Sequence, residues 1–240
     1  MPIDSNFKSV HEKEWEINFS QCAPNGALNY TDLCNLLQLT AAEHADLGGI
    51  SFTDMQKFNQ AWVLSRMRIE ITKLPKWKDV ITIKTWIKTL ENSRSVRCLE
   101  MYLNAEKIVG CETFWVVINT KTRRPDNLAL PHTHFEKFDT DSILNPIQKI
   151  NIPEVFTFKN ERKILLSDID IVNHANNVKY LEWCLDVTNV ETVLSQKIKT
   201  LNLNYLQELN YNDAIEIHHT TTSFLITKEA KSCFALEVEI

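Results

Sequence analysis

Apolar side chains recur at two spacings along the first part of the chain, and these spacings predict one helix followed by strands. Leu33, Leu36 and Leu37 follow the i, i+3, i+4 spacing that makes one face of a helix apolar. Further on, apolar residues alternate with polar ones, as they do in half-buried strands. Strands are predicted around residues 62–71, 80–87, 98–103 and 108–118.

The pattern stops and then starts again. Residues 119–153 break both periodicities and hold four of the seven prolines, so we predict a linker across the surface. Beyond it, residues 173–187 align with residues 25–39, which lie 148 positions earlier, and residues 212–217 align with residues 78–83, 134 positions earlier. The repeat predicts a duplicated α+β unit in which each antiparallel sheet curls around its helix. Val178, Leu181, Cys184 and Leu185 form the second helix stripe, and Phe234, Leu236, Val238 and Ile240 alternate along the last strand.

Composition narrows the possible functions. The 240 residues are 44% hydrophobic and 24% charged, with a net charge of −5, so the chain lacks the basic field of a nucleic-acid-binding protein. Only four glycines occur, and no glycine-rich nucleotide loop or G-x-S-x-G nucleophile turn can be written with them.

Targeting and metal signals are also missing from the sequence. The first sixteen residues have no apolar core of a signal peptide, and no stretch approaches about 18 apolar residues, so we expect a cytoplasmic protein without a membrane span. The six cysteines form no C-x-x-C pair, which favours buried reduced thiols. No histidine pair has the partner ligands of a metal site, so we expect no metal.

The densest polar cluster, residues 167–177, stands immediately before the second predicted helix. Asn176 or Asn177 caps this helix, and its free N–H groups suit the developing oxyanion of an ester or thioester. The partial positive charge of these N–H groups also favours a neutral His174 that accepts or relays a proton. Asp170 orients His174 or acts directly on a substrate. Asp and Asn are also common in turns that lead into helices, so residue types alone leave a structural role open.

Three segments together resemble the acyl-ACP thioesterase family, the tandem double-hotdog enzymes of plant and bacterial fatty-acid biosynthesis. DIDIVNHANNVKYLEW (168–183) resembles the family's Asp-x-Asn-x-His-x-Asn-Asn signature. AWVLSRMRIEITKLPKWKDVITIKTW (61–86) resembles its Trp-containing strand, Pro-Lys-Trp turn and following strand. NYLQELNYNDAIEI (204–217) resembles its Glu-Tyr-x-x-Glu-Cys-x-x-x-Asp segment. The resemblance covers roughly residues 10–125 and 160–225.

The resemblance assigns the catalytic positions one by one. It places the family's catalytic aspartate at Asp170, its histidine at His174 and its later acidic residue at Glu208. Val172 stands where the family usually has asparagine, so either Asn173, or Asn177 with the backbone N–H groups, takes that role. Hydrolysis is then expected to use water, with Glu208 or His174 as general base.

A thiol nucleophile is not expected. The position of the cysteine once discussed as a nucleophile in the family is Leu209. In the first copy, the alignment places Gly26 and Cys22 opposite His174 and Asp170, so we expect one active site in the chain.

The resemblance also implies a tandem double hotdog of the α+β class, in which the two hotdogs have different functions. Residues 1–130 form an N-terminal hotdog with the acyl-chain pocket, residues 131–153 a linker, and residues 154–240 the catalytic hotdog. No metal or organic cofactor is implied. Candidates to line the pocket are Leu33, Leu36, Leu37, Trp62, Leu64 and Met67, each of which is also an ordinary core candidate.

The expected partner is an acyl carrier protein that holds a fatty acyl chain. Because this carrier is acidic, it needs a basic docking surface on a chain whose own net charge is negative. Two basic clusters are candidates for that surface, Arg66 with Arg68, and Lys121 with Arg123 and Arg124. Hydrolysis of acyl-CoA and a non-catalytic acyl-binding role are the alternatives, and either a monomer or a homodimer fits two fused hotdogs.

Overall fold

The computed structural model describes residues 3–240, and these residues fold as two copies of a helix-and-sheet unit. The first half contains β1 (Val10–Glu16), α1 (Tyr30–Leu47), α2 (Phe52–Gln56), β2 (Gln60–Ile71), β3 (Val80–Glu91), β4 (Arg94–Leu103) and β5 (Glu106–Asn119). The second half contains β6 (Phe158–Lys163), α3 (Asn177–Asp186), α4 (Val190–Leu194), β7 (Thr200–Tyr205), β8 (Ala214–His219), β9 (Ser223–Lys228) and β10 (Lys231–Glu239).

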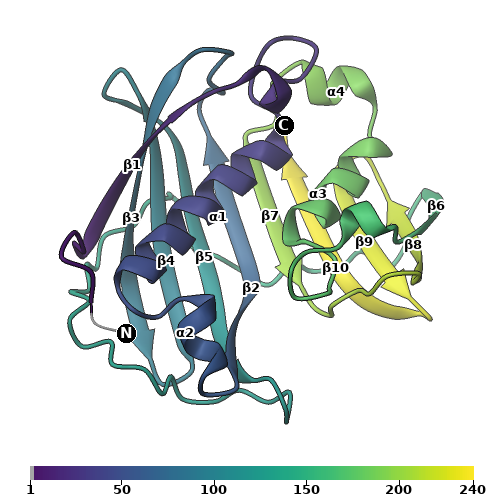
Figure 1. The fold of residues 1–240 in the computed structure, drawn as a ribbon. Helices are drawn as coiled ribbons and strands as arrows, with labels where there is room; N and C mark the ends of the chain where they lie inside the picture. The colour runs from purple at the N-terminus through teal and green to yellow at the C-terminus, as the bar shows by residue number, and fades with distance from the viewer. Residues whose placement is uncertain (1–2) are drawn as a thin grey trace.

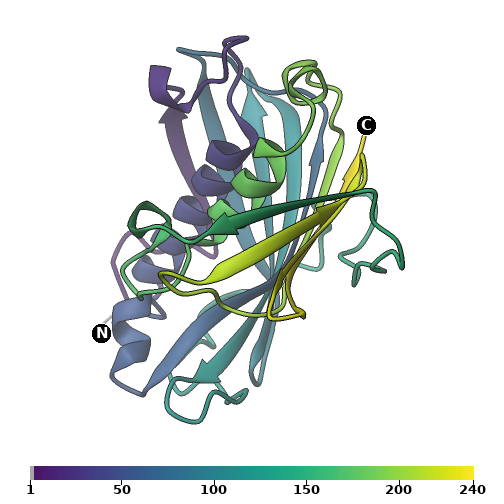
Figure 2. The same ribbon diagram turned by 90° about the vertical axis from the view of Figure 1, so that its right-hand side faces the viewer.

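All strands join one antiparallel sheet, in the order β1-β3-β4-β5-β2-β7-β10-β9-β8-β6 (Figure 1). The two halves meet where β2 pairs with β7, in a register that sets Arg66 opposite Asn204 and Glu70 opposite Thr200. Figure 2 shows both long helices on one side of this sheet, with the strands of the second half curving around them.

The predicted helices form because their apolar stripes face the sheet and their ends are capped. Leu33, Leu36 and Leu37 are buried on α1, as the spacing predicts. The helix begins where the Asn29 side chain accepts a hydrogen bond from the Asp32 N–H, and α3 begins in the same way at Asn176. On α3, Leu181 and Cys184 are buried while Val178 and Leu185 pack at the edge of the core.

The predicted apolar faces of β3, β4 and β10 are buried, whereas β5 and β7 contain runs of consecutive buried residues. Ile81, Ile83 and Ile87 on β3 are buried, and so are Leu99, Met101 and Leu103 on β4. Phe234, Leu236 and Val238 are buried on β10, but Ile240 lies beyond the end of that strand and is exposed. One large hydrophobic cluster includes side chains of both α1 and α3, so the core is continuous across the two halves.

The segment 120–157 contains no helix or strand. Residues 128–135 pack at the end of α1 and against α2, and residues 140–150 then cross β4, β5, β2 and β7. A Cβ atom at Gly110 of β5 would lie 1.9 Å from the Ser142 carbonyl oxygen, so only glycine allows the segment to cross there. Phe135 of the same segment is buried against Gly48 at the end of α1. No helix within residues 3–240 is both long and apolar enough to cross a membrane.

Candidate active site

The turn before α3 has a fixed backbone shape. Ile169 and Ala175 form a bridge across it, the Asp170 N–H donates to the His174 carbonyl at 2.9 Å, and Asn173 adopts φ 63°. A positive φ is unfavourable for most residues but is tolerated by asparagine. The Asp170 carboxylate accepts from the Val172 N–H at 2.9 Å, so within the described chain it stabilises the turn and makes no hydrogen bond to the His174 ring.

Asn176, and not Asn177, is the cap of α3. Its side chain accepts a hydrogen bond from the Val178 N–H at 3.1 Å. Asn177 is the first helical residue, and its Nδ2 donates to Gln38 Oε1 of α1 at 3.3 Å while its carbonyl accepts from the Tyr205 hydroxyl at 3.2 Å. The start of α3 is therefore held by residues of both halves.

His174 and Glu208 meet beside this helix end. His174 Nε2 lies 3.6 Å from Glu208 Oε2, and their side chains are 30% and 32% exposed, so both are open to solvent or a ligand. Arg123, which follows β5, forms an ion pair with the same Glu208 carboxylate oxygen. The site thus combines a histidine, a carboxylate and a guanidinium from three separate segments.

Glu208 reaches the site because its neighbour is fixed. Leu209 is buried, its carbonyl accepts from the Ala175 N–H at 2.8 Å, and its N–H donates to the Tyr180 hydroxyl at 3.0 Å. Burial raises the pKa of Tyr180, which keeps that hydroxyl neutral. The residue at the family's cysteine position is thus a structural anchor in this chain.

The six free cysteines have no environment that would activate a thiol. Five are buried and Cys22 is partly exposed. Burial raises the pKa of Cys34 and of Cys98 to about 12, so these thiols stay protonated.

The first copy contains the same turn, one residue away from where the sequence alignment places it. The cap Asn29 corresponds to Asn176, and Gly26, at φ 78°, corresponds to Asn173. The offset between the turns is therefore 147 and not 148. The alignment to Gly26 and Cys22 is wrong, and the true counterparts of His174 and Asp170 are Ala27 and Ala23.

The chemistry of the second turn has no counterpart in the first. Leu28 donates to the Pro75 carbonyl as Ala175 donates to that of Leu209, which makes Leu74 the counterpart of Glu208. Ala23, Ala27 and Leu74 line a cavity of about 550 Å³ between the first turn, the end of α3 and α4. At this end of the helix pair, apolar residues thus stand at the positions that Asp170, His174 and Glu208 occupy in the second copy.

The predicted pocket residues lie between the first-half sheet and its helices. Leu33, Leu36, Leu37, Leu64 and Met67 are all buried in the main core. Trp62 is partly buried beside a second apolar cluster, and its Nε1 donates to the Ile50 carbonyl at 3.2 Å.

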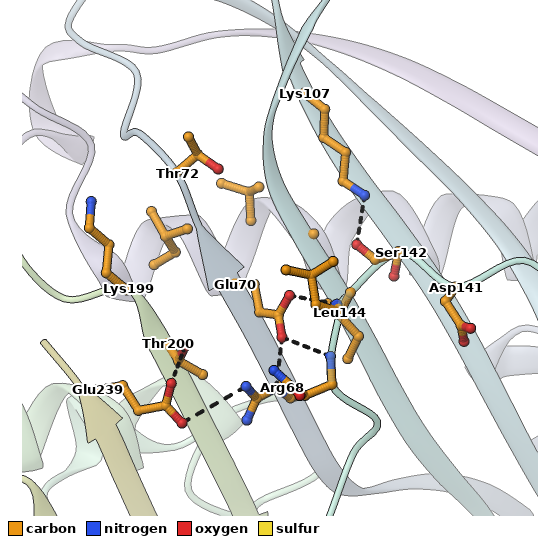
Figure 3. Close-up of a pocket in the computed structure, with 15 residues that line it drawn as sticks. Arg68, Glu70, Thr72, Lys107, Asp141, Ser142, Leu144, Lys199, Thr200 and Glu239 are labelled. Carbon is orange, nitrogen blue, oxygen red and sulfur yellow. Dashed lines mark hydrogen bonds and ion pairs between the residues drawn. The ribbon is translucent and has the colours of Figure 1, made fainter.

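The predicted docking residues differ in how they present their charge. Arg68 is only 7% exposed and donates a hydrogen bond to Asn202. Figure 3 shows it paired with Glu70 and Glu239 as well, so it is unsuited to docking a partner. Arg66 is partly exposed and lies over the Phe114 ring. Lys121, Arg123 and Arg124 are exposed on one turn, and Arg123 connects this turn to Glu208.

Sequence reasoning missed the polar residues that support the site from other elements, namely Gln38, Tyr180 and Tyr205. Gln38 left a signal, because a polar residue directly follows the apolar stripe of α1. The two tyrosines left none, since aromatic residues are common in any core.

Comparison with known proteins identifies the family. Residues 8–130 match the acyl-ACP thioesterase N-terminal domain, and residues 154–239 match the acyl-ACP thioesterase C-terminal domain. The chain is 27% identical over 234 residues to oleoyl-acyl carrier protein thioesterase 1, chloroplastic, of Arabidopsis thaliana, covering 89% of this chain and 64% of that protein. It is 27% identical over 225 residues to palmitoyl-acyl carrier protein thioesterase, chloroplastic, of Cuphea hookeriana, covering 86% of this chain and 54% of that protein. The chain thus spans between half and two thirds of these relatives.

Solved structures establish the fold. An acyl-ACP thioesterase from Bacteroides thetaiotaomicron superposes with a TM-score of 0.87 at 22% identity, covering 96% of this chain and 97% of that one. The 12:0-ACP thioesterase from Umbellularia californica gives a TM-score of 0.81 at 19% identity, covering 97% of each chain. The predicted tandem double hotdog is confirmed. The two domain matches together cover most of the sequence, and the chain therefore belongs to the acyl-ACP thioesterase family.

Proposed function

We propose that the protein is a thioester hydrolase that releases free fatty acid from acyl-acyl carrier protein. The observation that carries this proposal is the meeting of His174, Glu208 and Arg123 at the start of α3. Family membership supports the substrate class, and the relatives from Arabidopsis thaliana and Cuphea hookeriana are acyl carrier protein thioesterases.

Water is the proposed nucleophile. Glu208 accepts a proton as the water oxygen attacks the thioester carbon, and the C–O bond forms while the carbonyl electrons move onto oxygen. The C–S bond then breaks, and His174, whose Nε2 lies 3.6 Å from Glu208 Oε2, relays the proton that Glu208 accepted to the departing sulfur. Asp170, with Asn173 at its positive φ, holds the turn, while Asn177, whose backbone N–H is the first of α3, faces the carbonyl oxygen.

The carrier docks, in this proposal, on the turn that bears Lys121, Arg123 and Arg124. All three are exposed, and the ion pair from Arg123 to Glu208 sets this turn beside the reacting groups. A basic surface attracts an acidic partner and speeds its association. Arg66 can extend this surface, whereas Arg68 is buried and is not part of the proposed docking surface.

The acyl chain would occupy the N-terminal hotdog, residues 1–130, against Leu33, Leu36, Leu37, Trp62, Leu64 and Met67. Residues 131–153 then act as a linker, and residues 154–240 carry the catalysis. We place the enzyme in the cytoplasm, because five of its six cysteines are buried free thiols, which suits a reducing compartment. The oligomeric state is proposed to be a monomer or a homodimer.

The test is thiol release from C8 to C18 acyl-ACPs and the matching acyl-CoAs by the wild type, His174→Ala and Asp170→Ala. We expect release from acyl-ACP that falls about 100-fold or more in both variants. His174 is a proton-transfer group, and such groups contribute about 10²- to 10⁴-fold, whereas Asp170 holds the turn that positions His174. Release from acyl-CoA alone would reassign the carrier. Absence of release from both would make this a binding protein, and wild-type turnover in both variants would refute the site.

Glu208→Gln tests the proposed general base. The substitution keeps the shape of the side chain and removes its charge, so kcat should fall about 100-fold while KM changes little. Steady-state kinetics on the preferred acyl-ACP measures both values. An unchanged kcat removes Glu208 from the mechanism.

A further inference from the structure

Gln38 carries an unused hydrogen-bond donor next to the start of α3. Its Oε1 accepts from Asn177 Nδ2 at 3.3 Å. Its Nε2 is buried, and no acceptor within residues 3–240 forms a hydrogen bond with it. A buried N–H group without a partner costs free energy, so such groups are rare in folded proteins. The Tyr30 hydroxyl and Trp183 Nε1 are also buried without a hydrogen bond to any described residue. What distinguishes the Gln38 donor is its place beside Asn177, at the start of α3.

The start of α1, beside the first turn, shows which residue types suffice for packing where no reactive groups are present. With the offset of 147 between the two turns, the counterpart of Gln38 is Leu185, and the counterpart of Asn177 is Tyr30. Leu185 and Tyr30 both line the cavity beside the first turn, where the counterparts of His174 and Glu208 are apolar. A leucine thus meets the packing needs of this position, and the amide occurs only at the end that has the reactive groups.

We propose that Gln38 contacts the substrate and that its Nε2–H donates a hydrogen bond to the thioester carbonyl oxygen. The inference rests on the proposed function. As water adds to the carbonyl carbon, negative charge moves onto this oxygen, and a donor already in place stabilises it more strongly than it stabilises the substrate. The glutamine amide is neutral, so it keeps this donor whatever the protonation of His174 and Glu208.

The active site is then shared between the two halves. The second half supplies Asp170, His174 and Glu208, and α1 of the first half supplies one of the groups that hold the carbonyl oxygen. Gln38 Oε1 also fixes the Asn177 side chain, so the glutamine orients one polar group while it presents another.

Two substitutions of Gln38 separate these roles. Gln38→Met keeps the length of the side chain and removes the donor and the acceptor. Gln38→Glu keeps an oxygen for Asn177 Nδ2 but replaces the N–H donor with oxygen. The matched control is Leu185→Met, which places the same residue at the counterpart position. Acyl-ACP turnover and thermal unfolding are measured for the wild type and all three variants.

We expect kcat to fall about 100-fold in both Gln38 variants with little change in KM, as for loss of one oxyanion donor, and to stay near wild type in Leu185→Met. Gln38→Met should change the melting temperature little, since it removes an unpaired buried donor but also removes the acceptor of Asn177 Nδ2. A wild-type kcat in Gln38→Glu would mean that the residue only holds Asn177, and would overturn the inference.

A binding measurement gives a second, independent readout. An acyl trifluoromethyl ketone, whose hydrate resembles the tetrahedral intermediate, should bind at least about tenfold more weakly to Gln38→Met than to the wild type. Equal binding, or a wild-type kcat in Gln38→Met, overturns the inference and leaves the proposed function standing. Failure of the wild type to release thiol from any acyl-ACP overturns both.

Discussion

His44 of α1 is a fully buried histidine held in one tautomer by its neighbours. Its Nδ1 accepts from Arg97 Nη1 at 2.7 Å, and its Nε2 donates to the Lys8 carbonyl at 2.9 Å. Burial lowers the pKa of His44 to about 2, and the nearby Arg97 cation adds to the effect. His44 therefore stays neutral in the folded protein at any pH where the protein works.

This buried histidine makes stability depend on pH. An unfolded histidine titrates near pH 6.5, so between that pH and the folded pKa of about 2 the unfolded state binds one more proton. The stabilisation is complete above pH 6.5 and is lost as the pH falls. Urea unfolding between pH 7.5 and 4.5 should show a slope for the wild type that exceeds that of His44→Gln by up to about 1.4 kcal/mol per pH unit. Parallel slopes would contradict this assignment.

At single residues, the sequence predicted the reactive side chains of the site better than the residues that contact them from other segments. The spacing before the second helix identified Asp170 and His174 as candidates, and the resemblance added Glu208. The structure brings His174 and Glu208 together. The contacts of Gln38 and Arg123 depend on how distant segments pack, and spacing within one segment carries no such information.

Each central helix begins at a capping asparagine, and this shared feature corrects the alignment of the two copies. The sequence alignment matched the similar strings NGA and NHA, whereas the structure matches the caps Asn29 and Asn176. Helices and strands were predictable because their periodicity spans many residues. The exact offset was not, because it depends on the backbone conformation of one short turn.

The two caps allow a paired test at the level of the element. Asn29→Ala and Asn176→Ala should each cost about 1 kcal/mol of unfolding free energy, since each removes one capping hydrogen bond. Only Asn176→Ala should also lower kcat, because only α3 begins at the proposed active site. Chemical denaturation and acyl-ACP turnover measure the two effects. Equal losses of kcat in both variants would argue against the α3 terminus as the catalytic one.

The whole molecule is built as one cooperative body despite its two copies. The β2–β7 ladder makes the sheet continuous, and one hydrophobic cluster reaches from α1 to α3. The sequence predicted the linker to cross the surface, but it did not predict how tightly the segment packs. Gly110 beneath Ser142 and Gly48 beneath Phe135 show that its path is fixed by close contacts.

Thermal unfolding should therefore occur as a single transition. Neither half can separate without breaking the shared ladder and exposing the common core. Differential scanning calorimetry should give one peak whose calorimetric and van't Hoff enthalpies agree. Two resolved peaks would show that the halves unfold independently.

The apolar turn of the first copy has an evolutionary consequence. In a symmetric dimer of single hotdogs, every substitution occurs in both subunits, so neither site can be lost without the other. Once both copies lie in one chain, each position mutates alone, and Ala27 and Leu74 can stand where His174 and Glu208 stand in the other copy. The first turn is thereby free of the constraint that the proposed chemistry places on the second turn, while α1 of the same copy still contributes Gln38 beside Asn177.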